Sequence, residues 1–237
     1  PLWSRGLGDV YKRQQSDLRT ADGGSLPPVV GSNYEAGLKS EWLDGKLNTS
    51  FALFRITERN RAQRDPAYPD VGDCCYDASG QVRSQGLEAE VSGRIAPGWE
   101  VAGGYTFNTT RYLKDNTNGG AAFRTFTPKH IFQLWTTYQL PGEWNRWSVG
   151  GGVNIKSGIY TESAVQGPVS GSSVRVSQAG YALWNARIGY RVSDHVSLGL
   201  NVNNLFDKVY YQRLGNADMG NAYGEPRSAM LNLRVKY

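Results

Sequence analysis

The sequence lacks any long apolar run. Hydrophobic residues make up only 39% of the 237 positions, and no stretch approaches the roughly 18 to 20 consecutive apolar residues that a membrane-spanning helix needs. This excludes a helical inner-membrane protein. A role in a membrane must therefore use strands. Because every backbone amide in hydrocarbon needs an internal partner, such strands have to close into a barrel.

Histidine and cysteine are also scarce, with two of each. His130 and His195 lie far apart, and neither stands at a spacing from cysteine or carboxylate that suggests a metal site. Glu88 and Glu90 could imitate the carboxylate pair of an enzyme, but they more simply belong to a polar wall that faces water. We expect no enzyme activity, no metal site, no cofactor and no nucleic-acid partner.

Glycine and aromatic residues are abundant instead. The chain has 29 glycines, 14 tyrosines and 7 tryptophans, a composition that suits many strands and turns. From about Asn33 onward, segments of about ten residues alternate apolar and polar side chains. At the C-terminus Leu231, Leu233 and Val235 share one face, which we expect to be convex. The pattern predicts an all-β fold, an antiparallel transmembrane β-barrel fragment of about nine strands. The predicted strands are 33–42, 46–57, 87–95, 99–108, 129–139, 147–157, 179–191, 196–211 and 228–237.

The connections alternate in length, as in outer-membrane barrels with short periplasmic turns and long external loops. The short ones are 43–45, 96–98, 140–146 and 192–195, and the long ones are 58–82, 112–128, 158–178 and 212–226. A soluble β-sandwich, the main alternative, has no reason to sort its loops this way. The segment NLFDK (Asn204 to Lys208) could be a hairpin turn, but splitting the chain there would make the long loops periplasmic. We therefore predict that 196–211 is one long, locally bent strand.

Aromatic side chains collect beside the short turns, where an interfacial girdle would lie. They are Trp42, Trp99, Trp144, Trp147, Tyr190 and Tyr237.

Residues 1–14 (PLWSRGLGDVYKRQ) show neither strand alternation nor the features of a signal peptide, and they resemble translated sequencing-adapter sequence. We interpret 1–14 as a non-native segment, with a piece of an upstream loop as the alternative, and 15–237 as the C-terminal part of a barrel. Nine strands would leave two unpaired edges, which lipid does not tolerate. We therefore expect the chain to be a fragment whose missing part lies upstream.

Five segments carry a family resemblance. They are LPPVVGSNYEAGLKSEWLDGKL (26–47), VRSQGLEAEVSG (82–93), FTPKHIFQLWTTYQLPG (126–142), GYALWNARIGYRVSDHVSLGLNVNNLFDKVYY (180–211) and YGEPRSAMLNLRVKY (223–237). In this order they resemble the final strands of TonB-dependent ferric siderophore receptors of the bacterial outer membrane. The resemblance implies a 22-stranded barrel with a plugged lumen, of which this chain would supply the last nine strands. It also implies a TonB energy-transducing complex that acts through the missing N-terminal region, and a barrel-assembly machinery that reads the last strand with Tyr237.

The implied cargo is a ferric siderophore, which brings its own ligands to iron, so the receptor needs an aromatic and cationic cup. The net charge of +5 suits this role, although basic loops also meet the phosphates of lipopolysaccharide. Phe126, Tyr160 and Tyr223 lie in long loops near strand ends and are the candidate substrate-binding residues. Arg227 has the parity of the outward-facing set, so we expect it to contact lipopolysaccharide. The alternatives are a receptor for another large nutrient, such as cobalamin or haem, and a passive porin.

Cys74 and Cys75 lie in the predicted external loop 58–82. Outside the cell the environment is oxidising, so a disulfide is expected. A bridge between these neighbours and pairing with cysteines elsewhere in a longer protein are both open.

Overall fold

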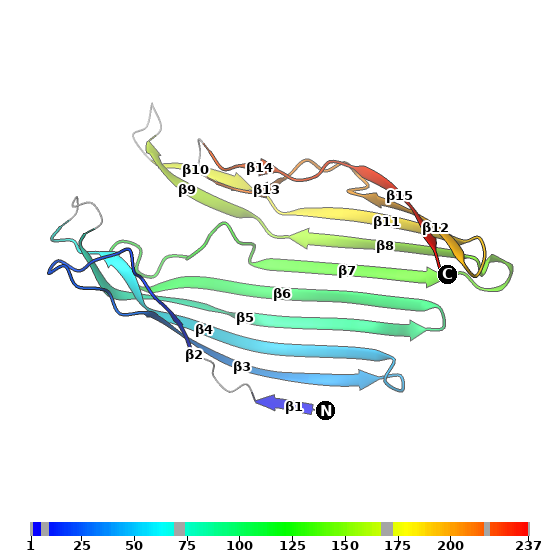
Figure 1. Ribbon diagram of the computed structural model, residues 1–237, viewed down its shortest axis with the longest axis horizontal. Coiled ribbons are helices and arrows are strands. Elements are labelled where there is room, and N and C mark those ends of the chain that lie inside the picture. Colours follow the sequence, from blue (N-terminus) through cyan, green and yellow to red (C-terminus); the bar gives the residue numbers. More distant parts are fainter. Residues whose placement is uncertain (1, 6–9, 69–73, 167–172, 216–218, 237) are drawn as a thin grey trace.

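The computed structural model describes residues 2–5, 10–68, 74–166, 173–215 and 219–236. Nine long strands run through it as an antiparallel meander in which each strand pairs with the next (Figure 1). They are β3 (Val29–Trp42), β4 (Leu47–Arg64), β5 (Tyr76–Ala96), β6 (Trp99–Lys114), β7 (His130–Gln139), β8 (Trp147–Lys156), β11 (Tyr181–Arg191), β12 (Val196–Asn203) and β15 (Ser228–Val235). The predicted all-β antiparallel fold of about nine strands is confirmed.

The two ends of the sheet are built differently. Short turns join the strands at one end, including the 3-10 turn η1 (Gly142–Trp144) between β7 and β8. At the other end, where β4 is connected to β5, two small hairpins project beyond the ends of β8 and β11 (Figure 1). They are β9 (Ile159–Gln166) with β10 (Ser173–Gln178), and β13 (Tyr211–Arg213) with β14 (Ala222–Tyr223). We call these the turn end and the loop end. None of the described helices is long or apolar enough to cross a membrane.

The connections at the loop end are shorter in the structure than the sequence predicts. β4 continues to Arg64 and β5 begins at Tyr76, so most of the predicted loop 58–82 is strand, and β6 continues to Lys114. The predicted loops 158–178 and 212–226 each contain a hairpin. These strand extensions lack the apolar–polar alternation that predicts a strand, because a strand that projects into water no longer needs an apolar face.

The prediction of one bent strand over 196–211 was wrong. β12 ends at Asn203, and Asn204 and Asp207 adopt positive φ values of 49° and 51°, which asparagine and aspartate tolerate better than most residues. The buried Asn204 side chain donates to the carbonyls of Lys208 and Glu225, both at 3.0 Å, and accepts from the Lys208 amide at 2.8 Å. This turn redirects the chain into β13, so the excursion between β12 and β15 still lies at the loop end.

The strand register sorts the side chains of the sheet onto two faces. One face is apolar across all nine strands; Leu231 pairs with Leu200, and Leu200 pairs in turn with Ile188. These side chains stay 41% to 73% exposed, so Leu231 and its neighbours Leu233 and Val235 do not lie in a sealed core between two sheets. The described residues contain no fully buried large side chain. This rules out the sandwich and leaves the apolar face open, as a lipid-facing surface requires.

The opposite face is polar. Glu88 and Glu90 lie on it, with the Ser50 hydroxyl 3.4 Å from a Glu90 carboxylate oxygen. Trp135 is a large aromatic residue on this face; its ring covers β8, where a Cβ added to Gly152 would lie only 2.5 Å from the Trp135 ring. Glycine is therefore required at 152 to let the ring lie against the strand.

The girdle prediction holds for four of its residues. Trp42, Trp99, Trp147 and Tyr190 share the apolar face at the turn end. Two indoles keep their polar edge satisfied: Trp42 donates to Thr49 at 2.9 Å and Trp99 to Thr136 at 2.7 Å. Trp144 is 63% exposed in η1, and Tyr237 lies outside the described residues.

Residues 2–5 and 10–13 form two short strands along β3. β1 (Leu2–Arg5) pairs with Ala36 to Lys39, and β2 (Val10–Arg13) pairs with Val29 to Ser32. The interpretation of 1–14 as a non-native segment stays a prediction.

Candidate ligand-binding site at the loop end

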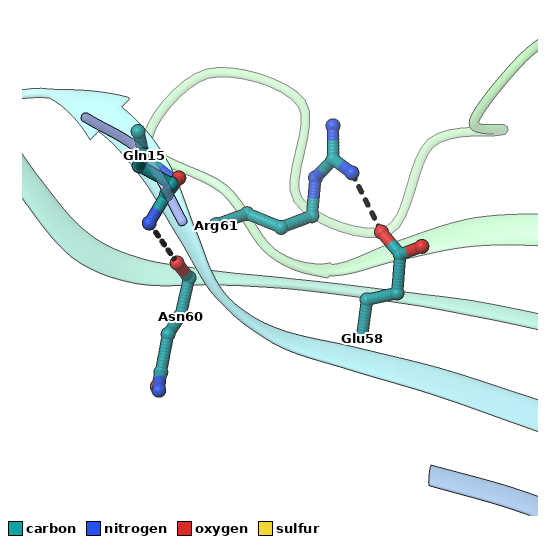
Figure 2. A network of polar contacts seen from close by, with 5 residues as sticks. Gln15, Glu58, Asn60 and Arg61 are labelled. Atoms are coloured by element: carbon teal, nitrogen blue, oxygen red, sulfur yellow. Dashed lines mark hydrogen bonds and ion pairs between the residues drawn. The ribbon is translucent and has the colours of Figure 1, made fainter. Parts of the chain in front are cut away.

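A polar network holds the loop end of β4, where the register with β5 shifts twice after Glu58. The Gln15 carboxamide donates to the Asn60 carbonyl at 2.8 Å and accepts from the Ala62 amide at 2.8 Å, and Arg61 forms an ion pair with Glu58 at 2.7 Å (Figure 2). Asn60 has a positive φ of 59°. The strand therefore bends here, and its unpaired backbone groups find side-chain partners instead.

Arg61 also reaches the connection between β6 and β7. Its guanidinium lies 4.9 Å from the centre of the Phe123 ring, and that ring packs edge-on against Tyr112 at 5.0 Å. Arg124 lies 5.3 Å from the same ring. Two cations and two aromatic rings are thus combined at one place on the loop end.

Tyr160 belongs to a second cluster, on the β9–β10 hairpin. The Arg175 guanidinium lies 4.4 Å from the centre of its ring and pairs with Glu162 at 2.5 Å. The hydrogen bond to Glu162 raises the pKa of Arg175 above its already high ordinary value. The Tyr160 amide donates to the Thr125 carbonyl at 3.1 Å, which brings Tyr160 beside the residue that precedes Phe126.

Tyr223 belongs to a third cluster, on the β13–β14 hairpin. Its ring stacks on Tyr211 with centroids 4.6 Å apart, and the two hydroxyls lie 3.2 Å apart. The hydrogen bond with Tyr223 raises the pKa of Tyr211 above its ordinary value. The Tyr211 amide donates to Gln178 at 2.9 Å, which ties this hairpin to the end of β10.

The three predicted site residues therefore lie at one end of the molecule but in separate places. The backbone hydrogen bond to Thr125 places Tyr160 one residue from Phe126, which is 50% exposed, whereas Tyr223 is 66% exposed on another hairpin. Sequence reasoning missed the residues that accompany them. These are Arg61, Phe123, Arg175 and Tyr211. Arg175 could have been found because valine alternates with polar residues in the segment SVRVSQ (173–178), as in a strand. Nothing in the sequence indicates that Arg61 reaches Phe123.

Cys74 and Cys75 are joined by a disulfide in the structure. Cys75 is 4% exposed, and its carbonyl accepts from the Asp65 amide at 2.9 Å. Arg64 donates to the Cys74 carbonyl at 2.6 Å and lies 4.7 Å from the centre of the Tyr76 ring. The cysteine pair thus lies just before β5 and against the end of β4.

The described residues contain no group of three or more histidine, cysteine or acidic side chains that could hold a metal ion. The loop end instead offers exposed aromatic rings next to arginines. Such a surface can bind a large, polar, aromatic or anionic ligand through ring contacts and charge-assisted hydrogen bonds.

The family model for the TonB-dependent receptor-like β-barrel matches residues 3–205 of this chain. The chain belongs to this family. It is therefore a portion of an outer-membrane barrel, with the apolar face toward lipid and the polar face toward the lumen.

Two relatives illustrate the similarity. The chain is 42% identical over 231 residues to the ferric-pyoverdine M114 receptor PbuA of Pseudomonas sp. (strain M114), covering 97% of this chain and 27% of that protein. It is 30% identical over 226 residues to the catecholate siderophore receptor Fiu of Escherichia coli (strain K12), covering 94% of this chain and 28% of that protein. The chain thus spans little more than a quarter of the curated relatives it matches.

The solved structures agree. The ferripyoverdine receptor of the outer membrane of Pseudomonas aeruginosa, bound to ferripyoverdine, superposes with a TM-score of 0.84 at 35% identity, over 96% of this chain and 30% of that one. The complex of FpvAI with pyocin S2 gives a TM-score of 0.84 at 34% identity, over 95% of this chain and 29% of that one.

Proposed function

We propose that this chain is part of the wall of an outer-membrane receptor that imports ferric siderophores. The observation that carries the proposal is the pairing of arginines with aromatic rings at the loop end, in a barrel whose relatives are named as ferric-pyoverdine and catecholate siderophore receptors. An anionic ferric complex fits such a surface because guanidinium groups satisfy its oxygens while the rings cover its flat groups.

Within this proposal, Phe126, Tyr160 and Tyr223 contact the ferric siderophore from the external side. Import is driven by the TonB energy-transducing complex, which acts through a region N-terminal to this chain. The barrel-assembly machinery inserts the barrel, and lipopolysaccharide surrounds its outer rim. A receptor for cobalamin or haem and a passive porin are the competing functions.

Uptake of 55Fe separates these functions. The full-length gene that contains this chain is expressed in a strain without siderophore receptors, and cells are given ferric pyoverdine, a ferric catecholate, haem or cobalamin (labelled with 57Co). We expect energy-dependent uptake of a ferric siderophore that disappears in a TonB-deficient strain. Uptake that survives without TonB would support a porin, and uptake of haem or cobalamin alone would replace the siderophore as cargo.

A further inference from the structure

A shallow hollow opens on the apolar face, on the lipid side of β3 to β6 and away from the loop-end clusters. Its volume is about 530 Å³, and two rows of paired side chains line it. The lower row is apolar and consists of Leu53, Leu87 and Phe107. The upper row, one step nearer the loop end, is polar and consists of Arg55, Gln85 and Thr109. We call this feature the rim hollow.

A row of cationic side chains lies one residue pair beyond the rim hollow, nearer the loop end. Arg83 on β5 pairs with Arg111 on β6, so two guanidinium side chains are direct cross-strand neighbours on the lipid side. Like charges in this arrangement destabilise a sheet. The Nε atom of Arg83 and the Oε1 atom of Gln85 are buried without a hydrogen-bond partner among the described residues. An anion between the two arginines would offset their repulsion and accept a hydrogen bond from the buried Arg83 Nε–H group.

No carboxylate on this face offsets these charges, since Glu35 borders the hollow but pairs with Phe54 and therefore points to the lumen side. The lipid-side positions of β3 to β6, from the Trp42 and Trp99 girdle up to Arg59 and Arg111, contain no aspartate or glutamate. The described ion pairs include none with Arg55, Arg83 or Arg111. The anion must therefore come from outside these strands.

The height of the rim hollow identifies the kind of anion. Trp99 at the turn end and Phe107 on β6 are eight residue steps apart, which is about 26 Å along the strand and about 20 Å across the membrane for a strand tilted by about 40°. Arg111, four steps further along β6, stands about 30 Å above Trp99 by the same reasoning. Phe107 therefore lies inside the apolar band, which is roughly 25 Å tall, and Arg111 lies just beyond it, where lipid headgroups begin. At this level acyl chains meet the lower row and headgroup phosphates meet the upper rows.

We propose that the rim hollow binds a phosphorylated, acylated lipid of the outer leaflet, with the chemistry of the lipid A part of lipopolysaccharide. A phosphate bridges Arg83 and Arg111 and lies within reach of Arg55, and an acyl chain lies against Leu53, Leu87 and Phe107. This site is on the lipid side of the wall, so it does not depend on which cargo the receptor carries.

The test uses the purified full-length receptor in non-ionic detergent and the double variant Arg83→Gln/Arg111→Gln. The control is Arg187→Gln/Arg234→Gln, which removes the same charge from the lumen side, where Arg187 pairs with Asn201 and Arg234 with Ser197. The probes are bisphosphorylated lipid A, lipid A stripped of phosphate, and inorganic phosphate. Ferric-siderophore binding is measured on each sample as a separate readout of folding and of the proposed function.

We expect the Arg83/Arg111 variant to bind bisphosphorylated lipid A about thirtyfold more weakly, as two arginines at a charged lipid surface contribute, while the control binds it unchanged. Dephosphorylated lipid A should bind weakly to every form. Three results would overturn the proposal. These are equal loss in both double variants, equal affinity for lipid A with and without phosphate, and binding of inorganic phosphate as tight as that of lipid A. Unchanged siderophore binding in the Arg83/Arg111 variant supports the separation of the two sites.

Discussion

Leu200 and Asn201 are consecutive residues of β12, yet they meet opposite environments. Leu200 lies on the lipid side between Ile188 and Leu231, and Asn201 lies on the lumen side beside Arg187. Between the girdle and the rim hollow, the lipid side is defined by hydrophobicity and tolerates almost any apolar residue. The lumen side carries specific polar and aromatic contacts. The structure of the lipid side at Leu200 therefore depends on overall hydrophobicity, whereas the structure of the lumen side at Asn201 depends on individual side-chain contacts.

The largest effect should come from placing a charge on the lipid side. Leu200→Arg in the full-length receptor should cost about 2 kcal/mol of unfolding free energy, because Leu200 lies one residue pair inside the girdle residue Tyr190, which pairs with Leu198, and an arginine there faces hydrocarbon in place of water. Asn201→Arg, one residue away, should cost far less because its side chain faces the lumen. Denaturant unfolding in lipid vesicles measures both. Equal costs would abolish the distinction between the two faces.

A smaller effect should come from steric crowding on the lumen side. Gly152→Val should destabilise the receptor by about 1 to 3 kcal/mol through overpacking, because its Cβ would meet the Trp135 ring at 2.5 Å and the Leu134 carbonyl at 2.6 Å. Gly151→Val is the matched control, since its Cβ would meet the nearest atom, the Asn185 carbonyl oxygen, at 3.5 Å on the lipid side. Thermal unfolding distinguishes the pair. A control that loses as much stability would exclude Trp135 as the cause.

The loop end should respond in binding and leave stability almost unchanged. Tyr223→Ala should weaken ferric-siderophore binding by roughly 1 to 3 kcal/mol if the exposed ring is a buried contact in the complex. Tyr34→Ala is a suitable control, because Tyr34 is equally exposed, at 65%, but lies on the lipid side. Titration with the ferric complex gives both affinities. Unchanged affinity in a correctly folded Tyr223 variant would remove Tyr223 from the cup.

The smallest expected effect concerns the oxidation state of the cysteine pair just before β5. Cys74 and Cys75 should be oxidised in the mature protein, so a maleimide applied to intact cells should modify neither residue. Prior reduction should expose both thiols to the reagent. Modification of both without reduction would contradict the assignment of a disulfide at this site.

The sequence was most informative where lipid imposes a period of two. The centres of all nine long strands and the turns at 43–45, 96–98 and 192–195 follow from that alternation, since a slip of one residue would expose the polar set to hydrocarbon. Strand segments that project into water need no such alternation, so the extensions of β4 to Arg64 and of β5 back to Tyr76 could not be predicted.

Two sequence signals at Asn204 predict different structures. Asparagine in NLFDK is a turn signal, whereas the alternation of short and long connections predicts that the strand continues through it. The structure satisfies both, because the turn at Asn204 leads into a hairpin at the same end of the sheet. Among the site residues, exposed aromatics near strand ends could be predicted. The arginines that accompany them, such as Arg61 over Phe123, depend on register shifts that leave no mark in the sequence.

Spin labels at positions 200 and 201 test the two-faced wall most directly. Each label is attached to a single introduced cysteine in the full-length receptor reconstituted in lipid, and its collisions with molecular oxygen and with a water-soluble nickel chelate are measured. Oxygen concentrates in hydrocarbon, so the label at 200 should collide often with oxygen and rarely with nickel. The label at 201 should show far fewer oxygen collisions. An equal oxygen collision rate at both positions, or a higher one at 201, would contradict the assignment of the apolar face to lipid.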